Sequence, residues 1–230
     1  MKVFEIKLKL YLLKDIPSID ALESIAGFLD NAILKSKELS DLHYVNSYKN
    51  YTFCSFYPLE KDRIHKKDSI YTVVIRTVEY KLADFFNEIA ANHYNHEMKA
   101  LTCEVKEIPK HFIEKVYTIT PLILKDDKGY WRPHMTFDEF ESRIKINLIK
   151  KYNKIMNCKL DEDFQLYNRI TLLNSAPIKV KYKEIHLLGD KIELEPADNE
   201  TAQKLIYMSL GTGVSELNAR GYGFLNYQWR

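Results

Sequence analysis

The sequence GTGVSELNARGYGF, residues 211–224, contains four of the seven glycines of this 230-residue chain. Glycine inside a helix or strand costs roughly 0.5–1 kcal/mol relative to alanine, so we expect each of these glycines to meet a backbone requirement. A helix that ends at Gly211 would need a positive φ there. Gly213, Gly221 and Gly223 have two explanations: tight packing of the loop on its own fold, or backbone N–H groups that approach an anion.

The composition is that of an ordinary globular protein, 46% hydrophobic and 29% charged, long enough for one large domain or two small ones. No apolar run reaches the ~18–20 residues that span a bilayer, so we expect no membrane partner. Lysines alternate with apolar residues at the N-terminus, which indicates a strand and not a signal peptide. Three widely separated cysteines in apolar surroundings favour the reducing cytoplasm. The net charge of +2 means that a polyanion could be bound only by local clusters of basic residues.

The first half of the chain has the pattern of alternating strands and amphipathic helices. A strand is expected over residues 2–13, and a helix capped by Asp20 carries an apolar face as far as Ile33. Two strands rich in β-branched and aromatic residues follow, a second helix carries apolar residues from 82 to 90, and residues 101–105 alternate as a closing strand. The order βαββαβ is the ferredoxin-like plan.

The same order then begins again. A strand at residues 116–124 precedes a helix opened by the capping box of Thr136 and Glu139. Strands are expected at 164–173, 179–188 and 222–229, and Asp198 is expected to cap the helix that ends at Gly211. The fold class predicted is therefore α+β, with two tandem ferredoxin-like domains, residues 1–112 and 113–230, each built on an antiparallel sheet.

The ending of the chain resembles a known family. A helix, the GTG of residues 211–213 and the Arg-Gly-Tyr-Gly of residues 220–223 resemble the C-terminal glycine-rich signature of the RAMP proteins. The sequence looks most like their CRISPR repeat-RNA-processing endoribonucleases, the Cas-six family, which consists of two ferredoxin-like halves. The resemblance spans the whole chain, but the C-terminal motif does not separate members that cut RNA from members that only bind it.

A second stretch, residues 42–53, bears on that distinction. His43, Lys49 and the strand Tyr51-Thr52-Phe53 match the family's histidine, lysine and aromatic-Thr-aromatic strand in kind and spacing. The resemblance implies that His43 and Lys49 are catalytic. The family's first-helix tyrosine would fall near Asp30, and the first helix here has no tyrosine. Tyr44 or Tyr48 could replace it, and the identity of the general base stays open.

These residues suffice for RNA cleavage without a metal or cofactor, and none is expected. The 2′-OH of RNA can attack the adjacent phosphorus and leave a 2′,3′-cyclic phosphate and a 5′-OH. The reference pKa of histidine, about 6.5, suits either proton transfer. A lysine such as Lys49 stays protonated and can stabilise the charge of the phosphorane.

Basic residues outside this pair form two further clusters. Residues 141–160 include Arg143 among six cations, and Lys179, Lys181 and Lys183 alternate along an expected strand, which would place them on one face. Together with Arg220 they form the predicted RNA-binding set, to which we add the four glycines of residues 211–223. The alternatives are a solvated helix face and lysine protection of a sheet edge.

Two functions remain open. The first is an endoribonuclease that cleaves CRISPR repeat RNA (pre-crRNA) and retains the crRNA. The second is a non-catalytic RAMP subunit that binds this RNA or scaffolds an effector complex, whose subunits would then be partners. Either would be cytoplasmic, and a monomer or weak homodimer. His134 and Thr136 match the HxT of two-histidine phosphoesterases, but the second copy is missing and Thr136 is better explained as a helix cap.

Overall fold

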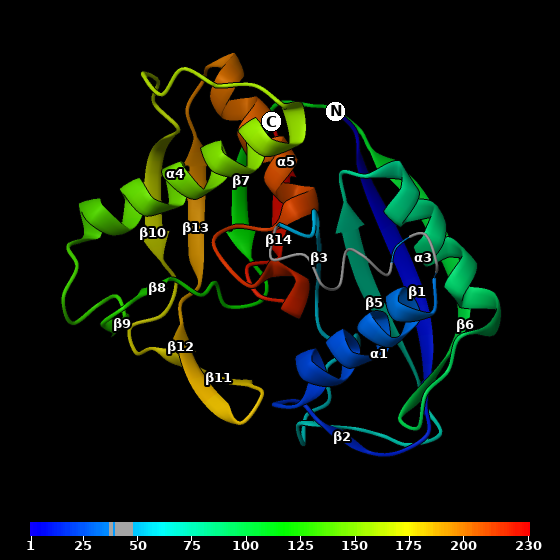
Figure 1. The fold of residues 1–230 in the computed structure, drawn as a ribbon. Coiled ribbons are helices and arrows are strands. Elements are labelled where there is room, and N and C mark those ends of the chain that lie inside the picture. Colours follow the sequence, from blue (N-terminus) through cyan, green and yellow to red (C-terminus); the bar gives the residue numbers. More distant parts are fainter. Residues whose placement is uncertain (37–38, 40–47) are drawn as a thin grey trace.

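The computed structural model describes residues 1–36, 39 and 48–230 of the chain (Figure 1). Its first half is a four-stranded antiparallel sheet in the order β3-β5-β1-β6. The elements are β1 (Val3–Leu12), α1 (Ala21–Lys35), β3 (Tyr51–Phe53), β5 (Ile70–Thr77), α3 (Tyr80–Asn92) and β6 (Met98–Ile108). A small ladder joins β2 (Ile16–Pro17) to β4 (Ile64–His65).

The second half repeats this topology with the order β10-β13-β7-β14. Its elements are β7 (Ile113–Thr118), α4 (Phe137–Met156), β10 (Tyr167–Leu172), β13 (Ile192–Pro196), α5 (Glu200–Thr212), η1 (Asn218–Arg220) and β14 (Leu225–Trp229). Two hairpins are added, β8 (Lys125–Asp126) with β9 (Gly129–Tyr130), and β11 (Ile178–Tyr182) with β12 (Ile185–Gly189). Both sheets have the ferredoxin-like order, so the predicted tandem fold is confirmed.

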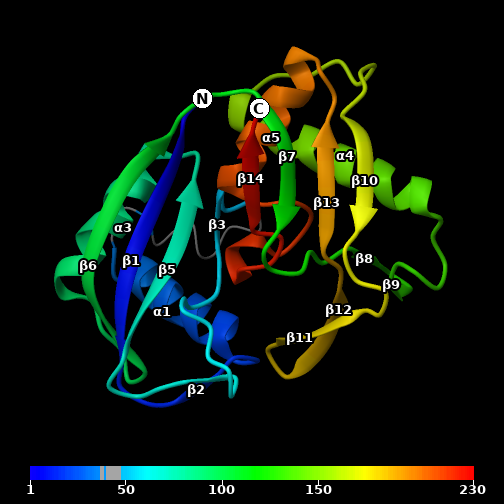
Figure 2. The ribbon, with the colours of Figure 1, turned by 180° about the vertical axis from the view of Figure 1, so that it is seen from behind.

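The helices lie on one side of both sheets, and the view from behind shows the strands uncovered (Figures 1 and 2). Helix α1 buries Ile25, Phe28, Leu29 and Ala32 against the first sheet because these residues recur at helical spacing. Helix α4 begins at the capping box that the sequence predicts, with the Glu139 N–H donating to Thr136 Oγ1 at 3.2 Å. Each half therefore has its own apolar core.

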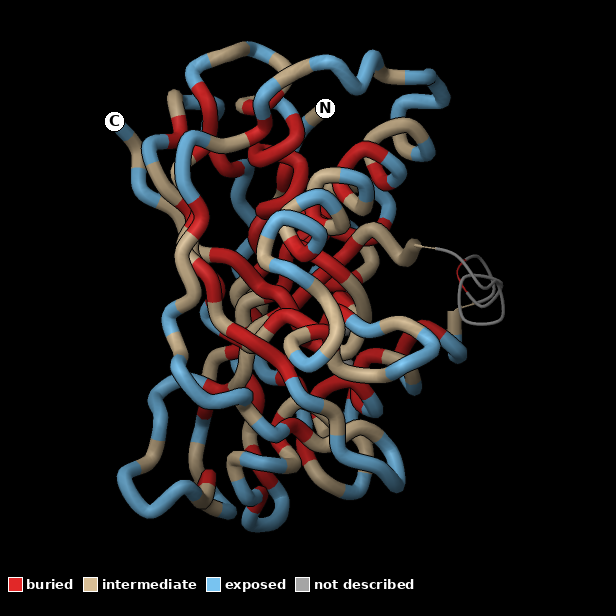
Figure 3. The backbone as a smooth tube through the Cα atoms, turned by 90° about the vertical axis from the view of Figure 1, so that its left-hand side faces the viewer, coloured by how far each residue is buried: buried red, intermediate tan, exposed pale blue. Residues whose placement is uncertain are grey.

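Helix α5 differs from the others because it is buried on all sides at its C-terminal end. Residues 205–212 are buried without interruption, and the helix contacts β1, β3 and β5 of the first half as well as its own sheet. Its Tyr207 hydroxyl donates to the Ile108 carbonyl at 2.6 Å and accepts from the Val3 N–H at 3.2 Å. Figure 3 shows buried segments of backbone running through the middle of the molecule. The helix thus joins the two halves.

A buried arginine makes a second connection between the halves. Arg76 of β5 pairs with Glu5 of β1 at 2.8 Å and donates to the Leu225 carbonyl of β14 at 2.6 Å. Its guanidinium also lies 4.6 Å from the centroid of the Phe224 ring and 5.1 Å from that of Tyr227. Because the charge is paired and hydrogen-bonded, its burial is compensated, and it fixes β14 against the first sheet.

Three sequence predictions about the second half are wrong. Residues 179–188 do not form one strand of the sheet but most of the β11–β12 hairpin, and the sheet strand is β13, which the sequence analysis did not predict. Helix α5 continues through Gly211 and is capped by Gly213 with φ 72°. Its N-cap is Asn199, whose Oδ1 accepts from the Ala202 N–H, and not Asp198.

In the first half, Asp20 stands at the N-cap of α1 but makes no side-chain cap bond, because it pairs with Lys181 instead.

Gly211 is required by close contact between the halves. A Cβ there would lie 2.9 Å from Val78 Cγ1 and 3.0 Å from the carbonyl carbon of Thr77, distances that force neighbouring atoms to shift. We therefore expect Gly211→Ala to lower the free energy of unfolding by about 1–3 kcal/mol.

The matched control is Gly27→Ala in α1, where nothing lies within 4 Å of the added methyl group. This variant should gain about 0.5–1 kcal/mol from helix propensity. Urea unfolding of both variants tests the contact, and equal stabilities would contradict it.

Candidate functional site

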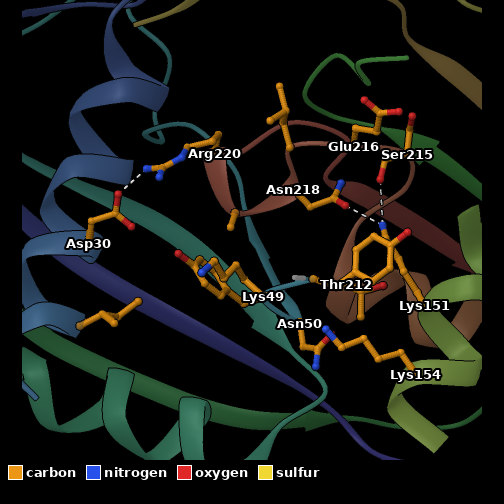
Figure 4. A pocket seen from close by; sticks show the side chains of 15 residues that line it. Asp30, Lys49, Asn50, Lys151, Lys154, Thr212, Ser215, Glu216, Asn218 and Arg220 are labelled. Atoms are coloured by element: carbon orange, nitrogen blue, oxygen red, sulfur yellow. Dashed lines mark hydrogen bonds and ion pairs between the residues drawn. The ribbon is translucent and has the colours of Figure 1, made fainter. Parts of the chain in front are cut away.

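A pocket of about 580 Å³ opens between the two halves (Figure 4). Four segments line it: the C-terminal part of α1, residues 48–51 before and within β3, the C-terminal part of α4, and residues 212–220. Its polar lining consists of Asp30, Tyr48, Lys49, Asn50, Lys151, Lys154, Thr212, Ser215, Glu216, Asn218 and Arg220. The glycine-rich segment therefore forms one wall of a pocket, and the first half forms the opposite wall.

Lys151 of α4 holds the glycine-rich loop, residues 213–223, in place by hydrogen bonds. This lysine is 1% exposed, and its Nζ donates to the Gly213 carbonyl at 2.8 Å, the Ser215 carbonyl at 3.0 Å and Asn218 Oδ1 at 2.6 Å. Asn218 Nδ2 in turn donates to the carbonyls of Val214 and Tyr222, both at 2.9 Å. All three ammonium protons are used inside the fold, so Lys151 acts on the loop and not on a ligand.

The structure corrects the prediction that the glycines contact RNA. Gly211, Gly213, Gly221 and Gly223 are buried. The N–H groups of Gly213, Gly221 and Gly223 donate to the carbonyls of other residues at 2.8–2.9 Å. A Cβ at Gly221 would lie 2.7 Å from the Phe53 ring and one at Gly223 would lie 2.1 Å from a carbonyl oxygen. Close packing is therefore the reason for these glycines, and their N–H groups form no anion cradle.

Two of the predicted cations lie together in the pocket. Arg220 reaches across it and forms an ion pair with Asp30 of α1, near which the resemblance would place a tyrosine. Figure 4 shows Lys49 close to this pair. Burial lowers the pKa of the Lys49 ammonium, Asp30 raises it, and the positive charges of Arg220 and Lys154 lower it again. The pocket therefore carries an excess of positive charge with one carboxylate facing it from α1.

His43 and Tyr44 lie outside the described residues, so the structure does not place them. Tyr48 is described and half-buried, and its ring centroid lies 5.8 Å from both Lys151 Nζ and Lys154 Nζ. Burial raises the pKa of its hydroxyl, and the carboxylate of Glu216 adds to this effect. Of the two tyrosines that could replace the missing one, Tyr48 therefore lies in the pocket.

The remaining predicted RNA-binding residues lie away from the pocket lining. Lys181 forms ion pairs with Asp20 at 2.8 Å and Glu23 at 3.2 Å. Lys183 is in the turn after β11 with φ 53°, so the three lysines do not follow one strand as predicted, while Lys179 is exposed on β11. Arg143 donates to the Lys125 carbonyl at 3.1 Å and lies 3.7 Å from Asp126.

The lining residues that were not predicted as part of the site include Lys151, Lys154 and Glu216. Lys151 had a signal in the sequence, because it lies three residues after Leu148 and seven after Ile144 on the apolar stripe of α4. A lysine on such a stripe needs internal acceptors. Glu216 had no signal beyond its place between the glycines.

A family model described as "CRISPR associated protein Cas6, C-terminal" matches residues 103–227, more than half of the chain. The chain belongs to the Cas6 family. This membership places it among proteins that process or bind CRISPR repeat RNA. No curated protein matches the sequence.

Solved structures of the Cas6 family have the same fold. A CRISPR-associated protein Cas6 aligns with a TM-score of 0.71 at 19% identity, over 98% of this chain and 99% of its own. An RAMP protein that binds different RNA substrates has a TM-score of 0.71 at 16% identity, with the same coverage. The product complex of a Thermus thermophilus Cas6 has a TM-score of 0.64 at 13% identity, over 99% of each chain. At these identities the likeness establishes the tandem fold.

In the part of this Cas6-family chain that the structure describes, no three His, Cys, Asp or Glu residues lie close enough to hold a metal ion. No described helix is long and apolar enough to cross a membrane. His93 is buried, with its Nε2 3.2 Å from the Phe28 carbonyl oxygen.

Burial lowers the pKa of Lys151 to about 7, although Glu216 and the three acceptor oxygens favour the charged form. The pKa of an unfolded lysine is about 10.4, so the unfolded chain binds more protons between about pH 7 and 10. Stability contributed by this group therefore rises with pH across that window. We expect the difference in free energy of unfolding between the wild type and Lys151→Met to grow from pH 7 to 9, by at most about 1.4 kcal/mol per pH unit.

Urea unfolding at pH 6, 7, 8 and 9 measures this difference. Lys150→Met, which removes the exposed neighbouring lysine, is the control and should show no such growth. A constant difference for Lys151→Met would contradict the lowered pKa.

Proposed function

We propose that this chain is a metal-independent endoribonuclease that cleaves CRISPR repeat RNA by 2′-OH attack, gives 2′,3′-cyclic phosphate and 5′-OH ends, and retains the crRNA product. The observation that carries the proposal is the convergence of Lys49, Lys154 and Arg220 on one pocket. These cations come from both halves of the chain, and a phosphodiester is the ligand that such a group suits best.

The residues divide the chemistry as follows. Lys49 directs its charge at the phosphorane, and Arg220 and Lys154 hold the flanking phosphates. His43, six residues before Lys49 in the sequence, transfers a proton to or from the reacting oxygens. The general base stays open between His43 and Tyr48. Residues 1–112 thus supply the reacting groups, and residues 113–230 supply RNA contacts.

Related structures support RNA as the ligand. One similar protein is described as binding different RNA substrates, and another was solved as a product complex. Arg220 is paired with Asp30 in this structure, so a phosphate that enters must share or replace this partner. The proposed location is the cytoplasm, where the three cysteines, which are free in the structure, stay reduced.

A second candidate is a non-catalytic RNA-binding or scaffolding subunit, with effector-complex subunits as partners. The observation that favours it is that α1 has no tyrosine near Asp30, where the resemblance places one, and that Asp30 itself pairs with Arg220. A carboxylate engaged in this way is a poor substitute for a tyrosine hydroxyl. The two candidates differ in whether the RNA is cut.

We expect His43→Ala to abolish cleavage of the repeat RNA from the same genome while RNA affinity stays within a few-fold, because general acid–base catalysis contributes about 10²–10⁴-fold. Lys49→Ala should also slow cleavage. Cleavage should proceed in EDTA and leave a 2′,3′-cyclic phosphate, detected by gel mobility before and after phosphatase treatment.

Unchanged cleavage by His43→Ala would remove His43 from the mechanism, and strict dependence on a metal would rule out the chemistry. Wild-type protein that binds the RNA but never cuts it would establish the scaffold candidate. Lys204→Ala on α5, outside the pocket lining and paired with Glu200 at 2.6 Å, is the control.

Arg220→Ala should weaken RNA binding about tenfold and leave single-turnover cleavage at saturating protein within a few-fold, because Arg220 binds and does not react. Filter binding and rapid-quench cleavage separate the two effects. The exposed Arg169→Ala of β10 is the matched control. Loss of cleavage with intact binding would contradict this division of roles.

A further inference from the structure

Two carboxylates line the pocket, and Asp30 is paired with Arg220 whereas Glu216 is not. Glu216 lines the cavity among Lys49, Lys154 and Arg220, and a carboxylate there repels a phosphodiester. Its side chain is half-buried, and its carboxylate makes no hydrogen bond or ion pair with the residues that the structure describes. Burial raises the pKa of Glu216, while the positive charges of Arg143, Lys125 and Lys151 lower it. The carboxylate oxygens of Glu216 therefore have no hydrogen-bond donor among the described residues.

The backbone that carries Glu216 is fixed from two directions. Its N–H donates to the Ile123 carbonyl at 3.3 Å, and the hydroxyl of Ser215 donates to the same carbonyl at 2.6 Å. The Ser215 carbonyl is held by Lys151 at 3.0 Å. Figure 4 shows Glu216 beside Ser215, on the side of Lys151 and away from Asp30. The carboxylate is therefore presented from a rigid support, as a recognition group requires.

An aromatic ring lies near this carboxylate. Tyr48 lines the same pocket, interacts electrostatically with Glu216, and lies close to the ammonium groups of Lys151 and Lys154. It also directly precedes Lys49 in the chain. A ring, an unpartnered carboxylate and a phosphate-binding lysine thus lie within one cavity, and unpaired bases in RNA are recognised by stacking and by contacts to their edges.

The chemistry of the carboxylate selects the base. Its two oxygens are adjacent acceptors, and they match two adjacent donors. On the Watson–Crick edge only guanine has such a pair, N1–H and N2–H, whereas adenine and cytosine place an acceptor beside their amino group and uracil has a single donor. We propose that Glu216 and Tyr48 form a guanine-selective subsite, in which an unpaired guanine stacks on Tyr48 and donates to Glu216. This inference rests on the proposed RNA-binding function of the pocket.

Short RNAs that do not depend on knowledge of the repeat test the subsite. The probes are three fluorescein-labelled nonamers, UUUUXUUUU, with X as guanine, inosine or adenine. Inosine keeps N1–H but lacks the N2 amino group. Fluorescence anisotropy with the full-length wild type should show guanine bound about tenfold more tightly than inosine, since a bidentate pair discriminates by about this factor or more.

Variants then test the residues. Glu216→Gln presents one acceptor and one donor, so it cannot accept from N1–H and N2–H together, and its preference for guanine over inosine should be lost. Tyr48→Leu should weaken binding of all three nonamers by a similar factor, because stacking does not depend on the edge. Glu184→Gln in the exposed turn after β11 removes the same charge outside the pocket lining and should keep the wild-type order.

The outcomes separate the subsite from the function on which it rests. Wild-type protein that binds guanine and inosine nonamers within twofold overturns the guanine subsite while the RNA-binding function stands. A Glu216→Gln variant that keeps the wild-type order also overturns it. Wild-type protein that binds none of the nonamers contradicts the RNA-binding pocket and the subsite together. A preference for guanine over inosine that Glu216→Gln abolishes supports the subsite whether or not the protein cleaves the repeat.

Discussion

The contact between the last helix and loop of the chain and its first sheet leaves no room for a methyl group at Gly211 or Gly221. Because of this contact, α5 packs on both sheets, Arg220 reaches Asp30 across the pocket, and β14 comes within reach of Arg76. A side chain at either glycine would push the two halves apart and widen the pocket. The glycines allow the two halves to approach closely, and the side chains between the glycines line the pocket.

Within the pocket, the buried ammonium of Lys151 controls the shape of the loop. Three carbonyl-type oxygens, two from the backbone and one from Asn218, converge on it, and Asn218 fastens the two ends of the loop. A buried lysine is costly unless all its donors are used. Here they are, and the backbone that positions Glu216 and Arg220 is rigid as a result. The pocket thus combines fixed groups from the loop with Lys49 from the other half.

Much of the fold follows from local patterns. The two βαββαβ orders, the capping box at Thr136 and the apolar faces of the helices all appear in the sequence because each is decided by residues a few positions apart. The β11–β12 hairpin was missed because its turn at Lys183 adopts φ 53° without glycine, asparagine or proline to mark it. Lys49 and Arg220 were predicted from the resemblance, and the structure brings them to one pocket.

The sequence by itself determined the order of the elements, the tandem fold, and the presence of basic residues such as Lys49 and Arg220 in residues 42–53 and 211–224. The tertiary structure decided which of these cations face the pocket. Lys154 lines it, the Lys151 ammonium donates all its hydrogen bonds to the loop, and Lys181 forms an ion pair with Asp20 at the start of α1. It also decided that the glycines are required for close packing, and that the Glu216 carboxylate has no hydrogen bond or ion pair among the described residues. The physical reason is that burial and pairing depend on residues 60 or more positions apart, whose approach no local pattern records.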